Sequence, residues 1–243
     1  MQDLYTAARA LYNEAFPGEP ESFVDALFAL GYPQYLFTEC EEGELASMLF
    51  ALPYAIVTEE GERDARYLYA VATSKKFRGR GHAKRLLARV AAMGTPVFLR
   101  PMSPSLFDFY RSAGFTPFCA HGECCGDAAG EIDGVTRLDE REYLAMRDTL
   151  APLPYCRPTP QYLALSFAFG GAVCKAGEFA ALYEIDGDTV LFKEWWGDTK
   201  SIPHVAKFLG AKHYRARYPD QNGTPFGMGV GIPDGCRFLA ALD

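Results

Sequence analysis

The sequence lacks the signals of secreted, membrane-spanning and metal-centred proteins. It has no apolar run of the about 18 to 20 residues that a bilayer span needs, and its first residues lack the basic and then apolar pattern of a secretion signal. Its 7 cysteines are odd in number and show no double CxxC spacing of a zinc site. These absences predict a reduced, cytoplasmic protein without a membrane span or a metal centre.

The chain also has little positive charge. Its 24 Lys and Arg residues against 31 Asp and Glu residues give a formal net charge of −7 and a pI of about 5.2. Nucleic acids and anionic membranes bind broad basic surfaces, so we expect neither as the main partner. The acidic balance favours a cationic amine as a small-molecule or peptide substrate, although it does not identify one.

The 243 residues contain enough apolar side chains, 49% hydrophobic and 14% aromatic, for one large domain or two small ones. Apolar periodicity and Gly or Pro breaks predict helices and strands in alternation over the first half. The expected order is helices at 4–16 and 21–30, strands at 34–40, 45–58 and 65–73, a helix at 81–92, a strand at 96–100 and a helix at 104–113. This order indicates an α/β domain with a mixed sheet.

The character of the sequence changes after Phe118. A glycine-rich stretch at 121–134 precedes a charged helix at 139–150 that starts with Asp139 as its cap, and 151–154 has the composition of a linker. We therefore predict two domains, 1–138 and 139–243.

The second part contains a hairpin signal, Asp186-Gly187-Asp188, between strands at 179–185 and 189–195. A helix at 202–209 and a strand at 213–218 follow. The same succession describes the middle of the first half, which makes a degenerate internal duplication a reasonable hypothesis. The second copy has no glycine-rich basic loop between its strand and its helix.

That loop is the most informative feature of the first half. A hydrophobic strand ending in Val71-Ala72-Thr73 leads into Arg78-Gly79-Arg80-Gly81-His82-Ala83 and then into an amphipathic helix. Glycines let the backbone approach a ligand, and the first amides of a helix are free to bind an anion. A pyrophosphate suits such a loop, although a solvated basic turn without a ligand would have the same composition. The spacing matches neither the GxxxxGK[ST] of a Walker loop nor the GxGxxG of a dinucleotide site.

The block resembles motif A of the GNAT (GCN5-related) acyltransferases, whose signature [QR]-x-x-G-x-[GA] matches Arg78 to Ala83. A second match, a tyrosine followed by three residues and Gly-Phe, occurs at Tyr110 and Gly114-Phe115. The resemblance covers about 66–115 well and the last hundred residues poorly. It implies a mixed, mostly antiparallel sheet flanked by helices, with a smaller α/β C-terminal half that is a degenerate repeat.

The resemblance further implies an N-acetyltransferase that binds acetyl-CoA or a related acyl-CoA as its cosubstrate. The pantetheine arm would bind the main chain of the strand, and the pyrophosphate would lie on the loop. The implied cofactor-binding residues are Val71, Ala72, Thr73, Arg78, Gly79, Arg80, Gly81, His82 and Ala83. Tyr110 would give a proton to the departing CoA thiolate, a role that suits a phenol of pKa about 10 facing a thiol of pKa about 8.5.

Several points stay open. The strand before the loop has no carboxylate to serve as a base, so Glu39 and the terminal carboxylate at Asp243 are the two candidates. Ser103 stands where the family often has an asparagine. The alternative to an enzyme is a non-catalytic acyl-CoA sensor or interaction protein. The acyl donor could also be a non-acetyl donor such as succinyl-CoA. The sequence leaves open whether the protein forms a homodimer.

Overall fold

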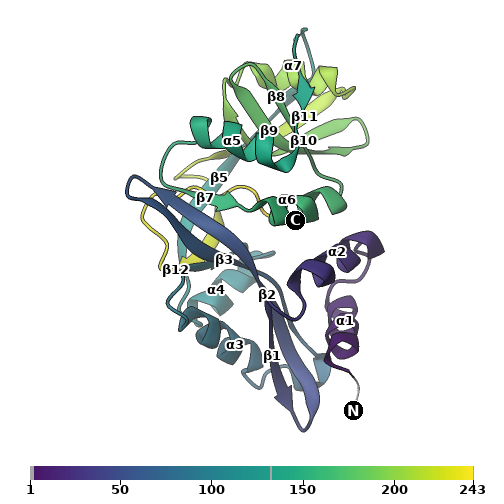
Figure 1. The fold of residues 1–243 in the computed structure, drawn as a ribbon, viewed down its shortest axis with the longest axis vertical. Coiled ribbons are helices and arrows are strands. Elements are labelled where there is room, and N and C mark those ends of the chain that lie inside the picture. The colour runs from purple at the N-terminus through teal and green to yellow at the C-terminus, as the bar shows by residue number, and fades with distance from the viewer. Residues whose placement is uncertain (1–2, 132, 243) are drawn as a thin grey trace. The chain divides into compact units, whose positions relative to one another are not determined.

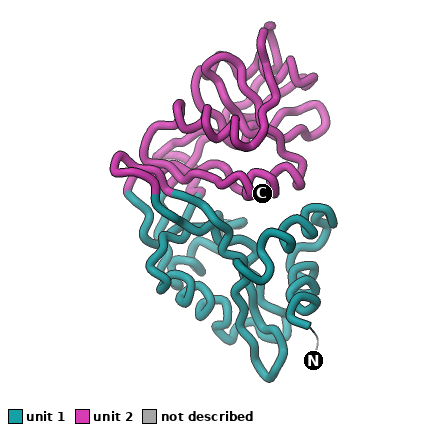
Figure 2. Tube along the Cα trace, viewed as in Figure 1, with its two compact units in different colours: residues 1–55, 63–118, 227–233 teal, residues 56–62, 119–226, 234–243 magenta. Residues whose placement is uncertain are grey.

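The computed structural model describes residues 3–131 and 133–242. Within this part the chain forms two compact units, each built from separate stretches (Figure 2). Unit 1 contains residues 1–55, 63–118 and 227–233, and unit 2 contains residues 56–62, 119–226 and 234–243. The predicted domains, 1–138 and 139–243, are single stretches, and that division stays a prediction. No described helix is long and apolar enough to cross a membrane.

The sheet of unit 1 has the strand order β1-β2-β3-β4-β12. Strand β1 (Leu36–Glu41) is antiparallel to β2 (Glu44–Thr58), and a tight turn joins β2 to β3 (Gly61–Thr73). Strand β4 (Val97–Leu99) is parallel to β3. The fifth position is filled by the end of β12 (Thr224–Val230), which runs antiparallel to β4. A segment from late in the chain thus completes the sheet of the first half.

Helices cover both faces of this sheet (Figure 1). Figure 1 shows α1 (Leu4–Ala15) and α2 (Glu21–Gly31) on one side of the strands, and α3 (His82–Ala91) and α4 (Pro104–Arg111) on the other. This arrangement leaves the C-terminal end of β3 between the two helical layers.

The cores on the two faces explain why these helices dock. On the α1–α2 face, Phe28 meets Phe50 edge-on with ring centroids 5.2 Å apart. On the other face, α3 buries Leu86 and Leu87 against Leu68 of β3. Because apolar residues of α3 recur on one side only, that helix has a single buried stripe and a basic outer surface.

Unit 2 repeats this plan. Its strand order is β5-β11-β10-β9-β8-β6, and β10 is parallel to β11 whereas β8 with β9 and β9 with β10 are antiparallel. The strands are β5 (Thr116–Asp127), β6 (Thr136–Arg137), β8 (Ala172–Ala176), β9 (Phe179–Asp186), β10 (Thr189–Gly197) and β11 (His213–Pro219). In addition, β7 (Tyr155–Pro158) pairs with β2.

The helices of unit 2 divide in the same way as those of unit 1. Helices α5 (Glu140–Leu150) and α6 (Pro160–Ala168) share one core with β8 and β9, and α7 (Ser201–Phe208) belongs to the core of the opposite face. Asp139 caps α5 as predicted, since its side chain accepts the amide of Glu142 in a capping box.

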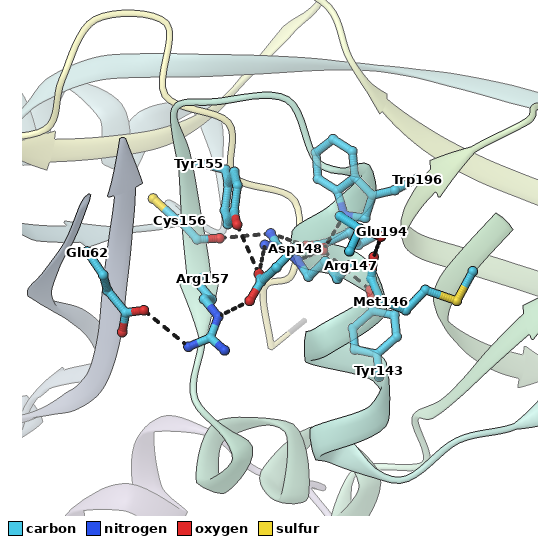
Figure 3. Close-up of polar contacts among 11 residues, drawn as sticks. Glu62, Tyr143, Met146, Arg147, Asp148, Tyr155, Cys156, Arg157, Glu194 and Trp196 are labelled. Carbon is cyan, nitrogen blue, oxygen red and sulfur yellow. Dashed lines mark hydrogen bonds and ion pairs between the residues drawn. The ribbon is translucent and has the colours of Figure 1, made fainter. Parts of the chain in front are cut away.

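A buried charged network lies between α5, β7 and β10 (Figure 3). The fully buried guanidinium of Arg147 donates to the carboxylate of Glu194, which also accepts from the indole of Trp196 at 2.6 Å and from the hydroxyl of Tyr143 at 3.4 Å. Arg147 donates in addition to the carbonyl of Cys156 at 2.9 Å. The network fixes one orientation of α5 on its sheet.

The glycine-rich stretch at 121–134, for which no strand was predicted, begins as part of β5. The reason lies across the ladder, where β11 pairs Tyr218 with Gly122 and Tyr214 with Gly126. A Cβ added at Gly126 would lie 2.6 Å from the Tyr214 hydroxyl oxygen. The glycines therefore make room for tyrosine rings in a strand, a known use of glycine in sheets.

Candidate active site

The site begins where β3 and β4 part. Their parallel register joins Arg66 to Val97 and Tyr67 to Phe98, after which β4 ends at Leu99 while β3 continues to Thr73. Just beyond the paired part, Ala70 has a positive φ of 53°, a conformation that costs a non-glycine residue free energy. The last residues of β3 therefore extend beyond the end of β4, where a ligand can line up beside their main chain.

Ser47 of β2 fixes the orientation of this strand end. Its buried hydroxyl donates to the carbonyl of Ala72 at 2.6 Å and lies 3.1 Å from the hydroxyl of Thr73. The carbonyl of Ala72 is thus turned to β2, and its neighbours Val71 and Thr73 line a cavity. Ser47 was not predicted, because only the paired strands bring it to the loop.

The loop after β3 has the conformation that its glycines predict. Gly79 and Gly81 have φ values of 78° and 80°, and Gly81 is the N-terminal cap of α3. No side chain caps this helix, and its first internal hydrogen bond runs from the Arg85 amide to the Gly81 carbonyl. The amides of the first turn thus point out of the helix end with its partial positive charge.

The imidazole of His82 is a structural part of the loop. It is buried, its Nδ1 lies 2.7 Å from Nη2 of Arg85, and its Nε2 lies 2.6 Å from a carboxylate oxygen of Glu41. Since a guanidinium only donates, Nδ1 must accept and Nε2 must carry the proton that Glu41 accepts. The ring fixes the helix start, and only its backbone amide is left for a ligand.

The two loop arginines differ in surroundings. Arg78 lines the cavity, and its Nε donates to the carbonyl of Thr73 at 3.2 Å. Arg80 instead forms an ion pair with Glu41, and its guanidinium lies 5.5 Å from the centroid of the Phe77 ring. Arg80, followed by His82, holds the pKa of the Glu41 carboxyl below its ordinary value. Arg78 is therefore the arginine available to an anion.

Tyr110 reaches the same cavity from α4. Its ring packs edge-on against Phe109 and Phe115, with centroids 5.2 and 6.0 Å away, and only 7% of the residue is exposed. Burial raises the pKa of the Tyr110 phenol to about 12. No hydrogen bond from its hydroxyl to another described residue is present, so the hydroxyl is free to donate to a ligand.

These groups surround one cavity of about 450 Å³. Of the predicted site residues, all except Ala72 and Arg80 line it. Four further residues were not predicted as part of the site: Phe77, Lys84, Leu106 and Phe109. Lys84 follows the loop directly and Phe109 adjoins Tyr110, so closeness in sequence to predicted site residues could have identified both of them.

Glu39 and Ser103 do not line the cavity. The Glu39 carboxylate lies 3.3 Å from Nη1 of Arg89 and 3.6 Å from Nε of Arg85, and Glu39 is not among the lining residues. Ser103 is the N-terminal cap residue of α4, and Asp243 lies outside the described residues.

Comparison with known proteins bears on this geometry. Residues 2–118 match the model of the acetyltransferase (GNAT) domain, whereas no curated protein matches the chain. Among solved structures, the chain is similar to a GCN5-related N-acetyltransferase from Kribbella flavida, with a TM-score of 0.68, 12% identity, and coverage of 94% of this chain and 69% of that one.

Two further structures are similar in fold. Eis1 from Mycobacterium abscessus has a TM-score of 0.64 and 14% identity over 93% of this chain and 65% of that one. A tandem GNAT protein from the clavulanic acid biosynthesis pathway has a TM-score of 0.50 and 9% identity over 95% and 96% of the two chains. At such identities the likeness concerns the fold, and it extends over both halves.

The family match covers β3, the glycine loop, α3 and α4, the elements that build the cavity. Residues 2–118 are therefore a GNAT acetyltransferase domain.

Proposed function

We propose that the protein transfers an acetyl group from acetyl-CoA to an amine by direct attack of the amine nitrogen. One observation carries the proposal: a single cavity of about 450 Å³ combines the free end of β3, the uncapped start of α3 and the Tyr110 hydroxyl. These are an extended edge for the pantetheine arm, an anion site for the diphosphate and a proton donor for the thiolate.

The residues fit this ligand in detail. The amides of His82, Ala83 and Lys84 precede the first helical hydrogen bond, and Arg78 adds a full positive charge beside them. A Cβ added at Gly79 would have no atom within 4 Å, so the loop leaves room for a diphosphate. The apolar side chains of Val71, Leu106 and Phe109 favour an acetyl group over a succinyl group, whose carboxylate they would leave without a partner.

Calorimetric binding of acetyl-CoA to two matched variants tests the site. Arg78→Gln and Lys76→Gln each remove one positive charge from the same loop, but only Arg78 lines the cavity, while Lys76 pairs with Glu44 at 2.6 Å. A charge-assisted hydrogen bond contributes about 1.5–3 kcal/mol, so Arg78→Gln should weaken acetyl-CoA binding about tenfold or more. Lys76→Gln should change it less than threefold.

Acetyl-pantetheine, which has no diphosphate, supplies the ligand control. Its affinity should be about the same for both variants, because it has no diphosphate that Arg78 could contact. Equal losses of acetyl-CoA affinity in the two variants would contradict the placement of the diphosphate on this loop.

A non-catalytic acyl-CoA sensor is the second candidate, because none of the described residues that line the cavity is a carboxylate that could serve as a base. Release of free CoA thiol, measured with and without an amine, separates the two. Amine-dependent release favours the transferase, and binding of acetyl-CoA without release favours the sensor.

A further inference from the structure

One carboxylate of unit 1, that of Glu19, lies on the side of β3 that packs against α1 and α2. Glu19, in the connection between α1 and α2, accepts hydrogen bonds from the hydroxyl of Tyr12 on α1 and, at 3.3 Å, from the hydroxyl of Tyr69 on β3. The residue is partly buried. Two phenols thus hold one carboxylate between a helix and the strand that lines the cavity.

Several carboxylates of unit 1 pair with cations, whereas Glu19 pairs with no described Lys, Arg or His. Glu21 pairs with Arg9, Glu41 with Arg80, and Glu44 with Lys76. Among the residues that the structure describes, no Lys, Arg or His forms an ion pair with Glu19. Burial raises the pKa of the Glu19 carboxyl, and the two tyrosine hydroxyls lower it by less. A partly buried anion held only by neutral donors is energetically costly and lacks a positive partner.

The position of Glu19 along β3 corresponds to the acyl end of the expected ligand. From the phosphate loop at 78–83, the cavity runs back along β3 through Thr73 and Val71. Tyr69, which holds Glu19, is four residues before Thr73, a separation of about 13 Å at 3.3 Å per strand residue. It directly precedes Ala70, whose positive φ marks the irregular point of the strand.

Aromatic rings surround the same point. Tyr69 meets Phe23 of α2 edge-on with centroids 6.1 Å apart, and Tyr12 lies 5.0 Å from Phe16. An ammonium group gains from both a carboxylate and nearby aromatic faces. The cluster of Glu19, Tyr12 and Tyr69 therefore has the chemistry of a site for a primary amine.

We propose that Glu19, held by Tyr12 and Tyr69, receives the ammonium group of the acceptor and takes its proton. This assignment rests on the proposed function, because the amine that it serves is the acceptor of the acetyl group. It names a primary alkyl or arylalkyl amine as the substrate class.

The ammonium gives one proton to the Glu19 carboxylate, and the freed nitrogen lone pair forms a bond with the thioester carbonyl carbon. The carbon–sulfur bond then breaks, and the thiolate takes the proton that Tyr110 donates. The second proton lost by the nitrogen restores Tyr110, and Glu19 releases its proton to water. The net change is amide, CoA thiol and one proton from ammonium and acetyl-CoA.

Amine binding without acetyl-CoA tests Glu19 by itself. The probes are benzylamine, tyramine and Nα-acetyl-lysine methylamide, with benzyl alcohol as the uncharged match of benzylamine, and the measurement is calorimetry at pH 7.5. Glu19→Gln keeps the size of the side chain and should lower amine affinity at least tenfold. Glu21→Gln, two residues away on the surface, should leave it within twofold, and benzyl alcohol should not distinguish the proteins. Equal amine affinity of wild type and Glu19→Gln, or no amine binding by the wild type, overturns the proposal.

Thermal unfolding separates this role from a purely structural one. Tyr12 and Tyr69 are the titratable groups that face Glu19. Because the folded protein raises the pKa of Glu19, the wild type loses stability as the pH rises from about 4.5 through that pKa. Glu19→Gln should melt at a higher temperature than the wild type at pH 8, with no gain at pH 4. A lower melting temperature at both pH values would indicate a structural anchor instead and overturn the proposal.

The proposed function fails by a different result. If acetyl-CoA does not bind the wild type, the transferase assignment falls, whatever the amine titrations of Glu19→Gln show.

Discussion

Replacing Tyr110 by phenylalanine removes one oxygen atom and leaves the rest of the site in place. The ring contacts with Phe109 and Phe115 do not involve the hydroxyl, and no described residue hydrogen-bonds to it. We therefore expect the free energy of unfolding of Tyr110→Phe to stay within about 1 kcal/mol of the wild type. A change in activity can then be assigned to the lost proton.

The size of that change follows from two pKa values. With the pKa of Tyr110 raised to about 12 and that of a thiol at about 8.5, complete proton transfer to a free thiolate would be uphill by about 5 kcal/mol. In the proposed reaction Tyr110 would therefore act mainly by donating a hydrogen bond as charge builds on sulfur, and the transfer would be completed when the nitrogen gives up its second proton. General acids of this kind contribute about 10²- to 10⁴-fold, so kcat should fall about 100-fold.

The assay is release of CoA thiol at saturating amine, with acetyl-CoA affinity measured by calorimetry. Affinity should change less than threefold, which places the loss in kcat. Since burial raises the pKa of Tyr110, its acid form persists across the assay range, and the wild-type rate should show no decline below about pH 11 from this group. A kcat within threefold of the wild type, or a decline near pH 9 that Tyr110→Phe abolishes, would refute the reasoning.

Two further predictions concern unit 2. Arg147→Met leaves the buried Glu194 without its cation and should cost about 3–5 kcal/mol of unfolding free energy in denaturant titrations. The double variant Arg147→Met with Glu194→Gln should cost less, because no charge stays buried. Equal costs of the single and the double variant would contradict a charge effect. Gly126→Ala introduces a Cβ 2.6 Å from the Tyr214 hydroxyl oxygen and should cost about 1 kcal/mol, and the additional change Tyr214→Ser should remove most of that cost. Persistence of the full cost in the double variant would point to the backbone of β5 instead of the ring.

The elements around the cavity could be predicted because their signals are local. Gly79 and Gly81 both need positive φ in the loop, and α3 shows its buried stripe directly in the spacing of its leucines. The roles of Ser47 and Glu41 could not be predicted. Each lies more than 20 residues from the group that it contacts, and only strand pairing brings them together. The same holds for Glu19, which meets Tyr69 across 50 residues.

Strands β5 and β12 were not predicted, for a related reason. Strand β5 carries glycines that are typical of loops, and their use appears only opposite the tyrosines of β11. Strand β12 reaches β4 across more than 120 residues, with Met228 opposite Leu99. Local propensity contains no information on a partner so distant in sequence.

These two strands also clarify the relation between the halves. In each unit, three successive strands lead through a helix to a fourth, parallel strand, as in β1-β2-β3-α3-β4 and β8-β9-β10-α7-β11. Next to each fourth strand lies a strand from the other half of the chain, since β12 pairs with β4 and β5 pairs with β11. The equal order of elements supports a duplicated fold in which the final strands are exchanged.

The second half lacks counterparts of two elements that line the cavity in the first half, the glycine-rich loop before α3 and the helix α4. The connection from β10 to α7 contains Asp198 and Lys200 in place of the paired glycines and arginines, and β11 leads to β12 by a short turn at Asp220–Gly223, without a counterpart of α4. Residues 139–242, the described part of the second half, therefore have neither a glycine-rich basic loop for a diphosphate nor a tyrosine equivalent to Tyr110. Because an acyl-CoA site requires both parts in one cavity, we expect one such site for each chain, in unit 1. The second half supplies β12, which pairs with β4.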